Sequence, residues 1–329
     1  MRAAVFERFG EPTEVLEIRE VPDPEPGPGE VRVRMIASPV NPSDLLVVRG
    51  RYGALPELPA IPGFEGVGIV EKAGPGLLGQ MVLGKRVVAI NARGGNWAEL
   101  AVIPARQARP LPDDIDDEQA AAFFVNPATV LAMVRHVLGV RRGDWLLQSA
   151  AGSTLGKMVI KLGRYDGFRT VNVVRRVEAK DELTRLGADA VISSEGGNLE
   201  ERIREATGGQ EIRHAIDAVG GETGTNLLRA LGTGGRLLVY GTLSGEPILA
   251  EPRVLIAGRR VVEGFWLGHW MRDRTIPEVL WLFRRIASLI RLGVLSSEIG
   301  ATFPLREIKA AVAEAERVGR SGKVLIRLE

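Results

Sequence analysis

Hydrophobic and polar positions follow two different periods along the chain, and the change of period predicts two kinds of structure. Up to about residue 118, short apolar runs such as "EVRVRMIAS" alternate with period two and are separated by turns rich in glycine and proline. Helical periodicity is confined there to a short segment at "NPSDLLVVRG". Residues 1–118 are therefore predicted to form a small, mainly antiparallel barrel or sandwich.

The pattern changes at "PDDIDDEQAAAFFVNPATVLAMVRH", where an acidic start precedes an apolar helix. Short apolar strands then alternate with amphipathic helices, which predicts a parallel, doubly wound sheet over residues 119–259. The strands are expected in "DWLLQSA", "TVNVVR", "AVISS", "IRHAIDAVG" and "RLLVYGT", with "VVEGFW" as a later one. A long amphipathic helix in "TIPEVLWLFRRIASLIRLG" and a strand–helix–strand tail follow. Residues 260–329 are expected to return to the first domain, which gives an α/β protein of two domains.

Composition excludes several classes of function. The 329 residues include no cysteine, and His136, His214 and His269 are far apart in sequence, so no metal site is expected. The net charge of +2 gives no reason to expect a nucleic-acid partner. The N-terminal residues lack the apolar core of a signal peptide, and the most apolar long stretch, residues 120–140, is interrupted by polar and charged side chains. A cytoplasmic protein without membrane contact is expected.

The turn in "QSAAGSTLGKMV" lies where a dinucleotide-binding loop would lie, between a predicted strand and a predicted helix. Only Gly156 matches a glycine of the G-x-G-x-x-G pattern. Small residues still let the backbone approach a pyrophosphate at the helix N-terminus, and Ser153 and Thr154 add hydroxyl donors. The alternative is an ordinary strand–helix turn in which a serine caps the helix.

The next strand favours NADP(H). It ends at Arg175 and Arg176, about 20 residues after Gly156, where an NAD site has an acidic residue for the ribose hydroxyl. Guanidinium groups suit a 2′-phosphate instead. The alternative is a pair of solvated arginines. Two further glycine turns, "DAVGG" and "VYGTLSG", follow apolar strands and would bring backbone close to the same cofactor.

These features together resemble the medium-chain dehydrogenase/reductase superfamily over nearly the whole chain. "GFEGVGIV", "LGADAVI" and "VNPSD" are typical of it. "NPSDLLVVRGRYGALPELPAIPGFEGVG", "FFVNPATVLAMV", "TVNVVRR" and "EGFWLGHW" are more specific and resemble the 2-enoyl thioester reductases, which act on enoyl-CoA or enoyl-ACP. NADPH:quinone oxidoreductases are the next most similar branch. The resemblance implies a GroES-like barrel domain, a Rossmann-like domain and a homodimer.

The zinc-dependent branch of that superfamily is excluded by the residues themselves. A ligand cysteine before the "SD" pair is missing, because the segment here is "NPSD". A ligand histidine in "GHEGVG" is replaced by Phe64 in "GFEGVG", and the four-cysteine loop of that branch is missing. A zinc-free reductase is expected.

The resemblance also implies roles for individual residues. Tyr52 corresponds to a tyrosine credited with protonating or polarising the substrate, and Asn126 to an asparagine that contacts the cofactor and supports catalysis. The remaining implied cofactor-binding residues are Gly152, Ser153, Thr154, Leu155, Arg175, Arg176, Tyr240, Gly241, Thr242, Leu243, Phe265, Trp266, Leu267 and Lys323. Tyr52, Trp266 and Trp270 are expected to line the substrate pocket, although the two tryptophans could instead pack an interface between domains.

The resulting hypothesis is conjugate reduction of a small-molecule enoyl thioester by NADPH. Hydride adds to the β-carbon, charge develops on the thioester oxygen, and a proton reaches the α-carbon. Such a reaction needs a hydrogen-bond donor at the oxygen and an acid nearby, for which Tyr52 is the candidate. The alternatives are an NADPH:quinone or enone reductase with the same cofactor, and an NADPH-binding protein with little catalysis.

Overall fold

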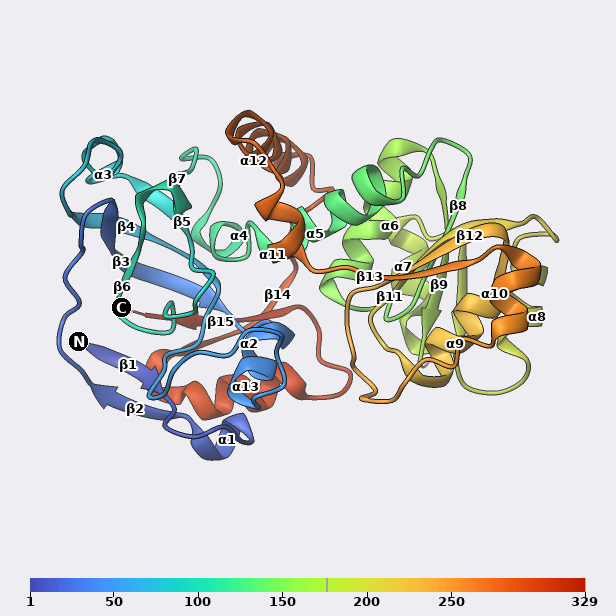
Figure 1. Cartoon of the computed structure of the whole chain (residues 1–329), viewed down its shortest axis with the longest axis horizontal. Coiled ribbons are helices and arrows are strands. Elements are labelled where there is room, and N and C mark those ends of the chain that lie inside the picture. The colour runs from blue at the N-terminus through green and yellow to red at the C-terminus, as the bar shows by residue number, and fades with distance from the viewer. Residues whose placement is uncertain (176, 329) are drawn as a thin grey trace. The chain divides into compact units, whose positions relative to one another are not determined.

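The computed structural model describes residues 1–175 and 177–328, and the chain forms two compact units. Unit 1 comprises residues 1–125 together with the segment that begins at Ser296, and unit 2 comprises Asn126–Leu295. Figure 1 shows the two units, with the chain leaving unit 1 and returning to it in its last, red segment. Unit 1 is therefore discontinuous in sequence, whereas unit 2 is one continuous stretch.

Unit 1 is built around a mainly antiparallel sheet in the order β14-β15-β3-β4-β5-β7, with β6 paired to β3. β1 and β2 form a separate antiparallel pair, and β14 and β15 are parallel to each other. Its strands are β1 (Arg2–Val5), β2 (Glu17–Glu20), β3 (Glu30–Pro39), β4 (Glu65–Ala73), β5 (Arg86–Ile90), β6 (Leu100–Pro104), β7 (Ala108–Pro110), β14 (Ile299–Pro304) and β15 (Lys323–Arg327).

Short helices fill the connections of unit 1. They are α1 (Pro12–Val15), α2 (Pro42–Val48), α3 (Leu77–Val82), the 3-10 turn η1 (Ala105–Gln107), α4 (Asp117–Ala121), the 3-10 turn η4 (Leu305–Glu307) and α13 (Ile308–Glu316). The buried side of the sheet forms one hydrophobic cluster that includes Val33, Met35, Trp97 and Ile326. The expected period-two alternation holds in the first half of β3, whereas the second half is buried on both faces.

Unit 2 contains the predicted parallel sheet, in the order β10-β9-β8-β11-β12-β13. Every adjacent pair is parallel. The strands are β8 (Trp145–Gln148), β9 (Arg169–Val174), β10 (Ala190–Ser193), β11 (Ile212–Asp217), β12 (Leu231–Val239) and β13 (Val261–Gly264). The strand order reverses between β8 and β11. The turns that follow these two strands therefore run in opposite directions, and a crevice can form between them at the carboxyl ends of the strands.

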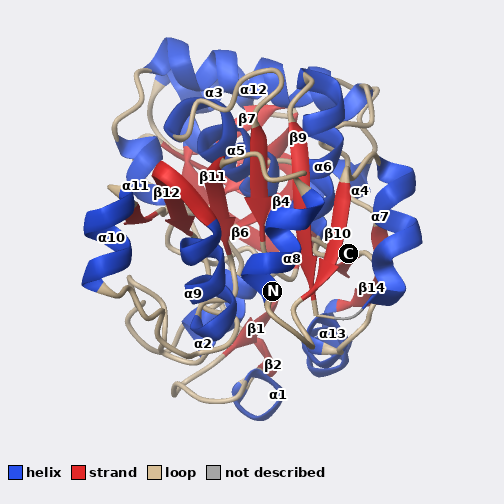
Figure 2. Ribbon diagram, turned by 90° about the vertical axis from the view of Figure 1, so that its right-hand side faces the viewer, coloured by secondary structure: helices blue, strands red, loops and turns tan. Residues whose placement is uncertain are grey.

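Helices cover both faces of this sheet, as Figure 2 shows for the ribbons around the red strands. Right-handed crossovers place α6 and α7 on one face, and α8, α9 and α10 on the other. The helices of unit 2 are α5 (Val125–Leu131), which begins in unit 1 and continues as the π-helix η2 (Ala132–Val137), α6 (Thr154–Asp166), the 3-10 turn η3 (Val177–Ala179), α7 (Lys180–Leu186), α8 (Leu199–Ala206), α9 (Gly221–Ala230), α10 (Pro252–Gly258), α11 (Leu267–Arg272) and α12 (Ile276–Arg291).

The boundaries of the units differ from the predicted 118/119 and 259/260. β13 extends the parallel sheet, because Val261 pairs with Arg236 and Gly264 with Val239, so residues just after 259 stay in unit 2. α12 also belongs to unit 2, where Leu282, Ile286 and Leu289 are buried. Only β14, α13 and β15 return to unit 1, as the strand–helix–strand tail predicts. Hydrophobic periodicity identified these elements correctly and could not say which sheet they join.

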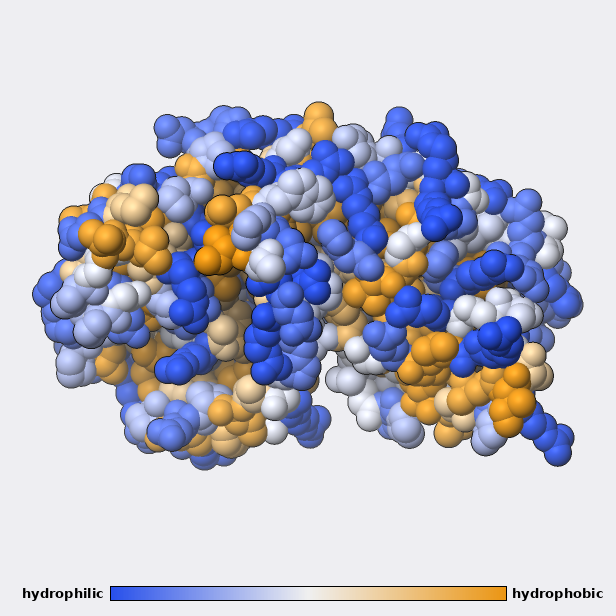
Figure 3. All heavy atoms as spheres, turned by 45° about the horizontal axis from the view of Figure 1, so that its top comes forward, coloured by the Kyte–Doolittle hydropathy of each residue, from blue (hydrophilic) through white to orange (hydrophobic). Residues whose placement is uncertain are grey.

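Hydrophobic side chains gather in separate patches on the molecular surface. At the left of Figure 3 one such patch lies over α3, where Leu77, Leu78 and Met81 are exposed. No helix in the described part of the chain is both long enough and apolar enough to cross a membrane.

The turn between β8 and α6 generates a test of the fold. A methyl group on Gly156 would come within 2.6 Å of the Ala151 carbonyl oxygen, whereas one on Gly152 would meet open space. We expect Gly156→Ala to destabilise unit 2 by about 1–3 kcal/mol, because the backbone must move to relieve the overlap. Thermal unfolding of the full chain measures this effect. Gly152→Ala is the matched control and should leave Tm unchanged; an equal Tm for both variants would contradict the close approach.

Candidate functional site

The turn that follows β8 is held by side chains of the strand itself. Buried Gln148 donates from Nε2 to the Gly156 carbonyl at 3.0 Å and to Asn172 Oδ1 at 2.7 Å, which links the turn to β9. Ala150 adopts a left-handed conformation with φ of 49° and directs the chain into α6. These contacts fix the backbone of residues 150–156 at the carboxyl edge of the sheet.

Ser153 caps helix α6, since its Oγ accepts a hydrogen bond from Gly156 N at 3.1 Å. That bond uses a lone pair and not the hydroxyl hydrogen, so a serine in this role can still donate to a phosphate. Gly152 and Ser153 are exposed, Thr154 is half-buried and Leu155 is buried against the core. The first three residues thus present an accessible helix N-terminus, where backbone amides and the helix dipole favour an anion.

A buried carboxylate anchors the turn after β11. Asp217 Oδ2 accepts from Gly220 N at 2.8 Å, and its Oδ1 accepts from Val219 N and from Ser149 Oγ. The Ser149 hydroxyl in turn accepts from Ala218 N at 2.9 Å. Sequence analysis singled out only the glycines of "DAVGG" and missed the anchoring role of Asp217. The feature that could have indicated it is an acidic residue at the end of one strand and a serine at the end of another.

The segment Tyr240–Leu243 leaves β12 beside that turn. Tyr240 N donates to Asp217 O at 2.9 Å, and Leu243 N donates to Ala218 O at 3.0 Å. A side chain on Gly241 would come within 2.7 Å of Ala218 O, so glycine permits this approach. The Tyr240 hydroxyl is buried, and burial, together with the nearby Asp217 charge, raises its pKa. Thr242 and Leu243 are exposed.

The segment after β13 continues the same edge. Phe265 N donates to Val239 O at 2.8 Å, which places residues 265–267 next to the end of β12. Phe265, Trp266 and Leu267 are half-buried. Trp266 packs on His269 with ring centroids 4.3 Å apart, and His269 is exposed on α11.

The structure therefore brings most of the expected cofactor-binding residues of unit 2 to one edge of one sheet. The ends of β8, β11, β12 and β13 are neighbours in strand order, and Arg175 follows β9 on the other side of β8. Arg175 is exposed, and its carbonyl accepts from Ser193 Oγ at 2.8 Å. Arg176 lies outside the described residues. Asn126 is half-buried in the first turn of α5.

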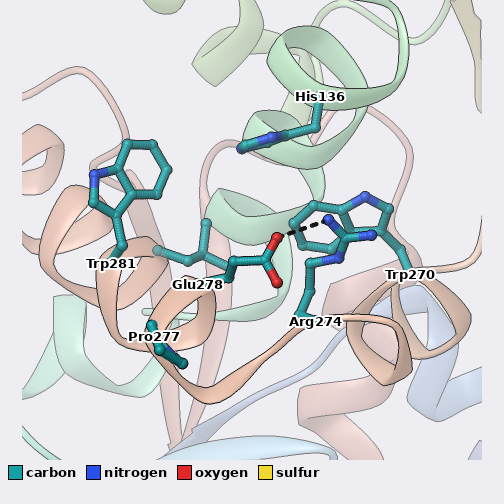
Figure 4. Close-up of a pocket in the computed structure, with 7 residues that line it drawn as sticks. His136, Trp270, Arg274, Pro277, Glu278 and Trp281 are labelled. Atoms are coloured by element: carbon teal, nitrogen blue, oxygen red, sulfur yellow. Dashed lines mark hydrogen bonds and ion pairs between the residues drawn. The ribbon is translucent and has the colours of Figure 1, made fainter.

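A pocket of about 280 Å³ lies in unit 2 and is lined mostly by residues that follow Trp266 in the sequence (Figure 4). Trp270 and Trp281 both approach His136, with ring centroids 5.4 and 6.0 Å away. Arg274 stacks over Trp270 and forms an ion pair with Glu278 at 3.2 Å. Burial, and then the Arg274 and Arg135 charges, lower the pKa of His136. Trp270, expected in a substrate pocket, thus lines a cavity with aromatic walls.

In unit 1, Tyr52 follows α2 and packs against Phe64, with ring centroids 5.3 Å apart. Its side chain is half-buried against the hydrophobic core of the unit. Phe64 immediately precedes β4, so the position of the Tyr52 ring depends on how that strand begins.

A cluster of buried charged residues lies behind this pair. Asp44, Glu65 and Lys323 each expose 4% of their surface or less. Burial, and secondarily the charge of Glu65, raises the pKa of Asp44 to about 7, although backbone N–H groups and Lys323 oppose the shift. Burial also lowers the pKa of Lys323. The Lys323 ammonium donates to Asn41 Oδ1 inside this cluster, so its expected contact with the cofactor stays a prediction.

Among the described residues, no group of three or more histidine or acidic side chains could hold a metal ion. The chain nevertheless matches two family models. Residues 154–285 match one described as zinc-binding dehydrogenase, and residues 27–113 match one described as alcohol dehydrogenase GroES-like domain.

Several known proteins that are similar to the chain are named as reductases or oxidoreductases. It is 33% identical over 332 residues to human mitochondrial enoyl-[acyl-carrier-protein] reductase, a match that covers 100% of this chain and 89% of the human one. The solved structure of Escherichia coli quinone oxidoreductase complexed with NADPH superimposes with a TM-score of 0.92 at 28% identity, covering 99% of this chain and 100% of that one. A 2-haloacrylate reductase structure gives a TM-score of 0.87 at 26% identity, with full coverage of both chains.

Proposed function

The chain belongs to the medium-chain dehydrogenase/reductase superfamily, and from that premise we propose that it is a zinc-independent, NADPH-dependent reductase of enoyl thioesters. The observation that carries this proposal is the match to enoyl-[acyl-carrier-protein] reductase along the full length of the chain. Tyr52, 11 residues before the first glycine of "GFEGVG", lies within that match.

The carboxyl edge of the parallel sheet fits NADPH. Gly152 leaves open space at the N-terminus of the 13-residue helix α6, where backbone amides can receive a pyrophosphate. The turns held by Asp217 and by Gly241 would lie along the rest of the cofactor, and Asn126, Thr242, Leu243 and Phe265 through Leu267 would contact its nicotinamide half. When bound there, NADPH supplies the hydride.

The residues of the chain then have to stabilise charge and deliver a proton. Hydride addition at the β-carbon moves an electron pair toward the thioester oxygen, and a donor at that oxygen lowers the barrier most when it is already oriented. We assign this role to the Tyr52 hydroxyl, because a phenol donates a hydrogen bond without ionising at neutral pH. A proton taken up at the α-carbon completes the saturated thioester. Trp266 and Trp270 would line the pocket for the acyl group.

Quinone reduction is the alternative, and the likeness to the E. coli quinone oxidoreductase with NADPH favours it. The two activities share a cofactor and differ in the acceptor, so one comparison separates them. We expect kcat/KM for crotonyl-CoA to exceed that for 9,10-phenanthrenequinone. A quinone preference of orders of magnitude would assign the chain to the quinone branch, and NADPH binding without turnover of either would leave a binding protein.

Tyr52→Phe tests the role of the tyrosine. Removal of one oxyanion donor typically lowers the rate by about 10²-fold or more, so kcat/KM for crotonyl-CoA should fall to that extent while the KM for NADPH stays unchanged. Tyr165→Phe, an exposed helical tyrosine in unit 2, is the control. An unchanged kcat/KM in Tyr52→Phe would remove this residue from the chemistry.

Arg175→Ala tests the 2′-phosphate contact. Loss of a charge-assisted bond to phosphate costs about 1.5–3 kcal/mol, so the Kd for NADPH should rise about tenfold or more while the Kd for NADH does not change. Fluorescence titration of both cofactors measures this. Arg185→Ala, an exposed arginine on α7, should leave both constants as they are. Equal losses for NADPH and NADH in Arg175→Ala would argue against recognition of the 2′-phosphate.

We further propose a homodimer in which β13 pairs with a second copy. β13 ends the strand order of its sheet, and Val261 and Val262 are 45% and 37% exposed. An exposed apolar edge strand is a template for pairing with another chain. Light scattering should give about twice the chain mass of 35.6 kDa. Val262→Lys should halve that mass, and Leu77→Lys, on the exposed face of α3, should not.

We propose a cytoplasmic location for this chain on the basis of its sequence composition. The human relative, in contrast, is named as a mitochondrial protein. Fractionation of the source cells would decide it.

A further inference from the structure

One buried carboxylate in unit 1 touches the segments on both sides of the Tyr52 loop. Asp44 Oδ2 accepts from Asn41 N at 2.8 Å, which fixes the start of α2. Asp44 Oδ1 accepts from Phe64 N at 3.0 Å, and the Phe64 ring packs on Tyr52. The chain enters the Tyr52 loop from α2 and leaves it toward Phe64, so this side chain holds the two ends of the loop together.

A second buried carboxylate reaches the helix that carries Asn126. Glu65 Oε2 accepts from Phe124 N at 3.0 Å and from Val125 N at 2.8 Å. These are backbone N–H groups at the start of α5, which a helix leaves without an internal partner. Asn126 is the next residue in the chain. Glu65 therefore fixes the backbone from which the Asn126 side chain extends.

Asn41 and Lys323 join the two carboxylates. Asn41 Nδ2 donates to Glu65 Oε1 at 3.0 Å, while its Oδ1 accepts from the Lys323 ammonium. Asn41 N is the donor to Asp44. The charges of Glu65 and Asp44 both favour the protonated form of Lys323 against the effect of burial. Each of these four residues thus hydrogen-bonds to another member of the cluster, although all four are buried in unit 1.

We propose that Asp44 and Glu65, joined through Asn41 and Lys323, form a positioning network that sets the Tyr52 ring and the start of the Asn126 helix for catalysis. The inference rests on the roles given above to Tyr52 and Asn126, and it adds four residues that act through them. None of the four is a catalytic residue, because the contacts described for them are to one another and to the backbone.

Burial of two carboxylates suits positioning better than it suits stability. Taking charges out of water costs free energy that attraction in the interior offsets only with good geometry, so apolar side chains would serve a plain core at least as well. A carboxylate instead accepts several N–H groups at defined angles. Asp44→Asn turns one acceptor into a donor that faces the N–H of either Asn41 or Phe64, and Glu65→Gln does the same against Asn41 or the start of α5.

Labelling the full chain with 3-fluorotyrosine tests directly whether Asp44 positions the Tyr52 ring. The sequence contains three tyrosines, Tyr52, Tyr165 and Tyr240, so the ¹⁹F spectrum has three resonances that single Tyr→Phe variants assign. Asp44→Asn should shift or broaden the Tyr52 resonance and leave the other two in place. If Asp44→Asn fails to fold, Lys323→Met, which removes the charged member that donates to Asn41, should produce the same selective change.

Hydrogen exchange tests whether Glu65 fixes the start of α5. Glu65→Gln should speed exchange at Phe124 and Val125, because their N–H groups lose a charged acceptor. Glu30→Gln is the matched control for both Asp44→Asn and Glu65→Gln. It makes the same carboxylate-to-amide change in the same unit, where Glu30 Oε2 accepts from Gly27 N at 3.0 Å. It should move neither the Tyr52 resonance nor exchange in α5.

Kinetics then connect position to rate. Asp44→Asn should lower kcat for crotonyl-CoA about 10–100-fold, as small misplacements of catalytic groups do, with the KM for NADPH unchanged. In the Tyr52→Phe background the same substitution should add little, because both changes act through one ring.

The network and the proposed function fail in different ways. If Asp44→Asn, or Lys323→Met in its place, leaves the Tyr52 resonance unmoved, and Glu65→Gln leaves exchange in α5 unchanged, the network is overturned whatever the enzyme reduces. If Tyr52→Phe keeps full activity, the catalytic role of Tyr52 is wrong while the spectra still decide whether the network positions its ring.

Discussion

A carboxylate removed from water must have its oxygens satisfied by protein donors, and in unit 1 this requirement ties together segments that are far apart in sequence. Asp44 lies on a short helix, Glu65 begins a strand, and Lys323 begins the last strand of the chain. The donors to the two carboxylates are largely backbone N–H groups, whose positions depend on φ and ψ rather than on side-chain rotation. The arrangement is therefore specific to one backbone path, and the Tyr52 loop lies on that path.

Unit 2 satisfies a comparable requirement with a different set of groups. Asp217 is fully buried at the carboxyl edge of the sheet, and its carboxylate accepts from the backbone of the turn that follows its own strand. Fully buried Gln148 donates from Nε2 to the Gly156 carbonyl at the start of α6. The turns at this edge of the sheet consist largely of small residues, so their backbone is accessible, and buried hydrogen bonds hold it in place. Both units thus place rigid polar contacts behind the segments that a substrate or cofactor would touch, which is how a preorganised site keeps its geometry.

Local pattern was sufficient to predict the two kinds of domain, the strands of the parallel sheet and the turn before α6. It was not sufficient to assign β13 and α12, because a hydrophobic strand or helix carries the same period whichever sheet it packs on. The anchoring roles of Asp217, Ser149 and Gln148 were also missed: hydrogen bonds between strands depend on strand order, which is a property of the fold. The contact of Lys323 with Asn41, 282 positions away in sequence, was likewise not visible in any local pattern.

That long separation has a consequence for how the chain folds during synthesis. β3 pairs with β15, and the buried acidic pair is joined through Asn41 to the Lys323 ammonium, which follows the whole of unit 2 in sequence. Unit 2 is continuous and is complete in sequence before β15 exists. Domains usually fold as units in the order of their synthesis, but unit 1 can complete its sheet only after the whole of unit 2 has been synthesised.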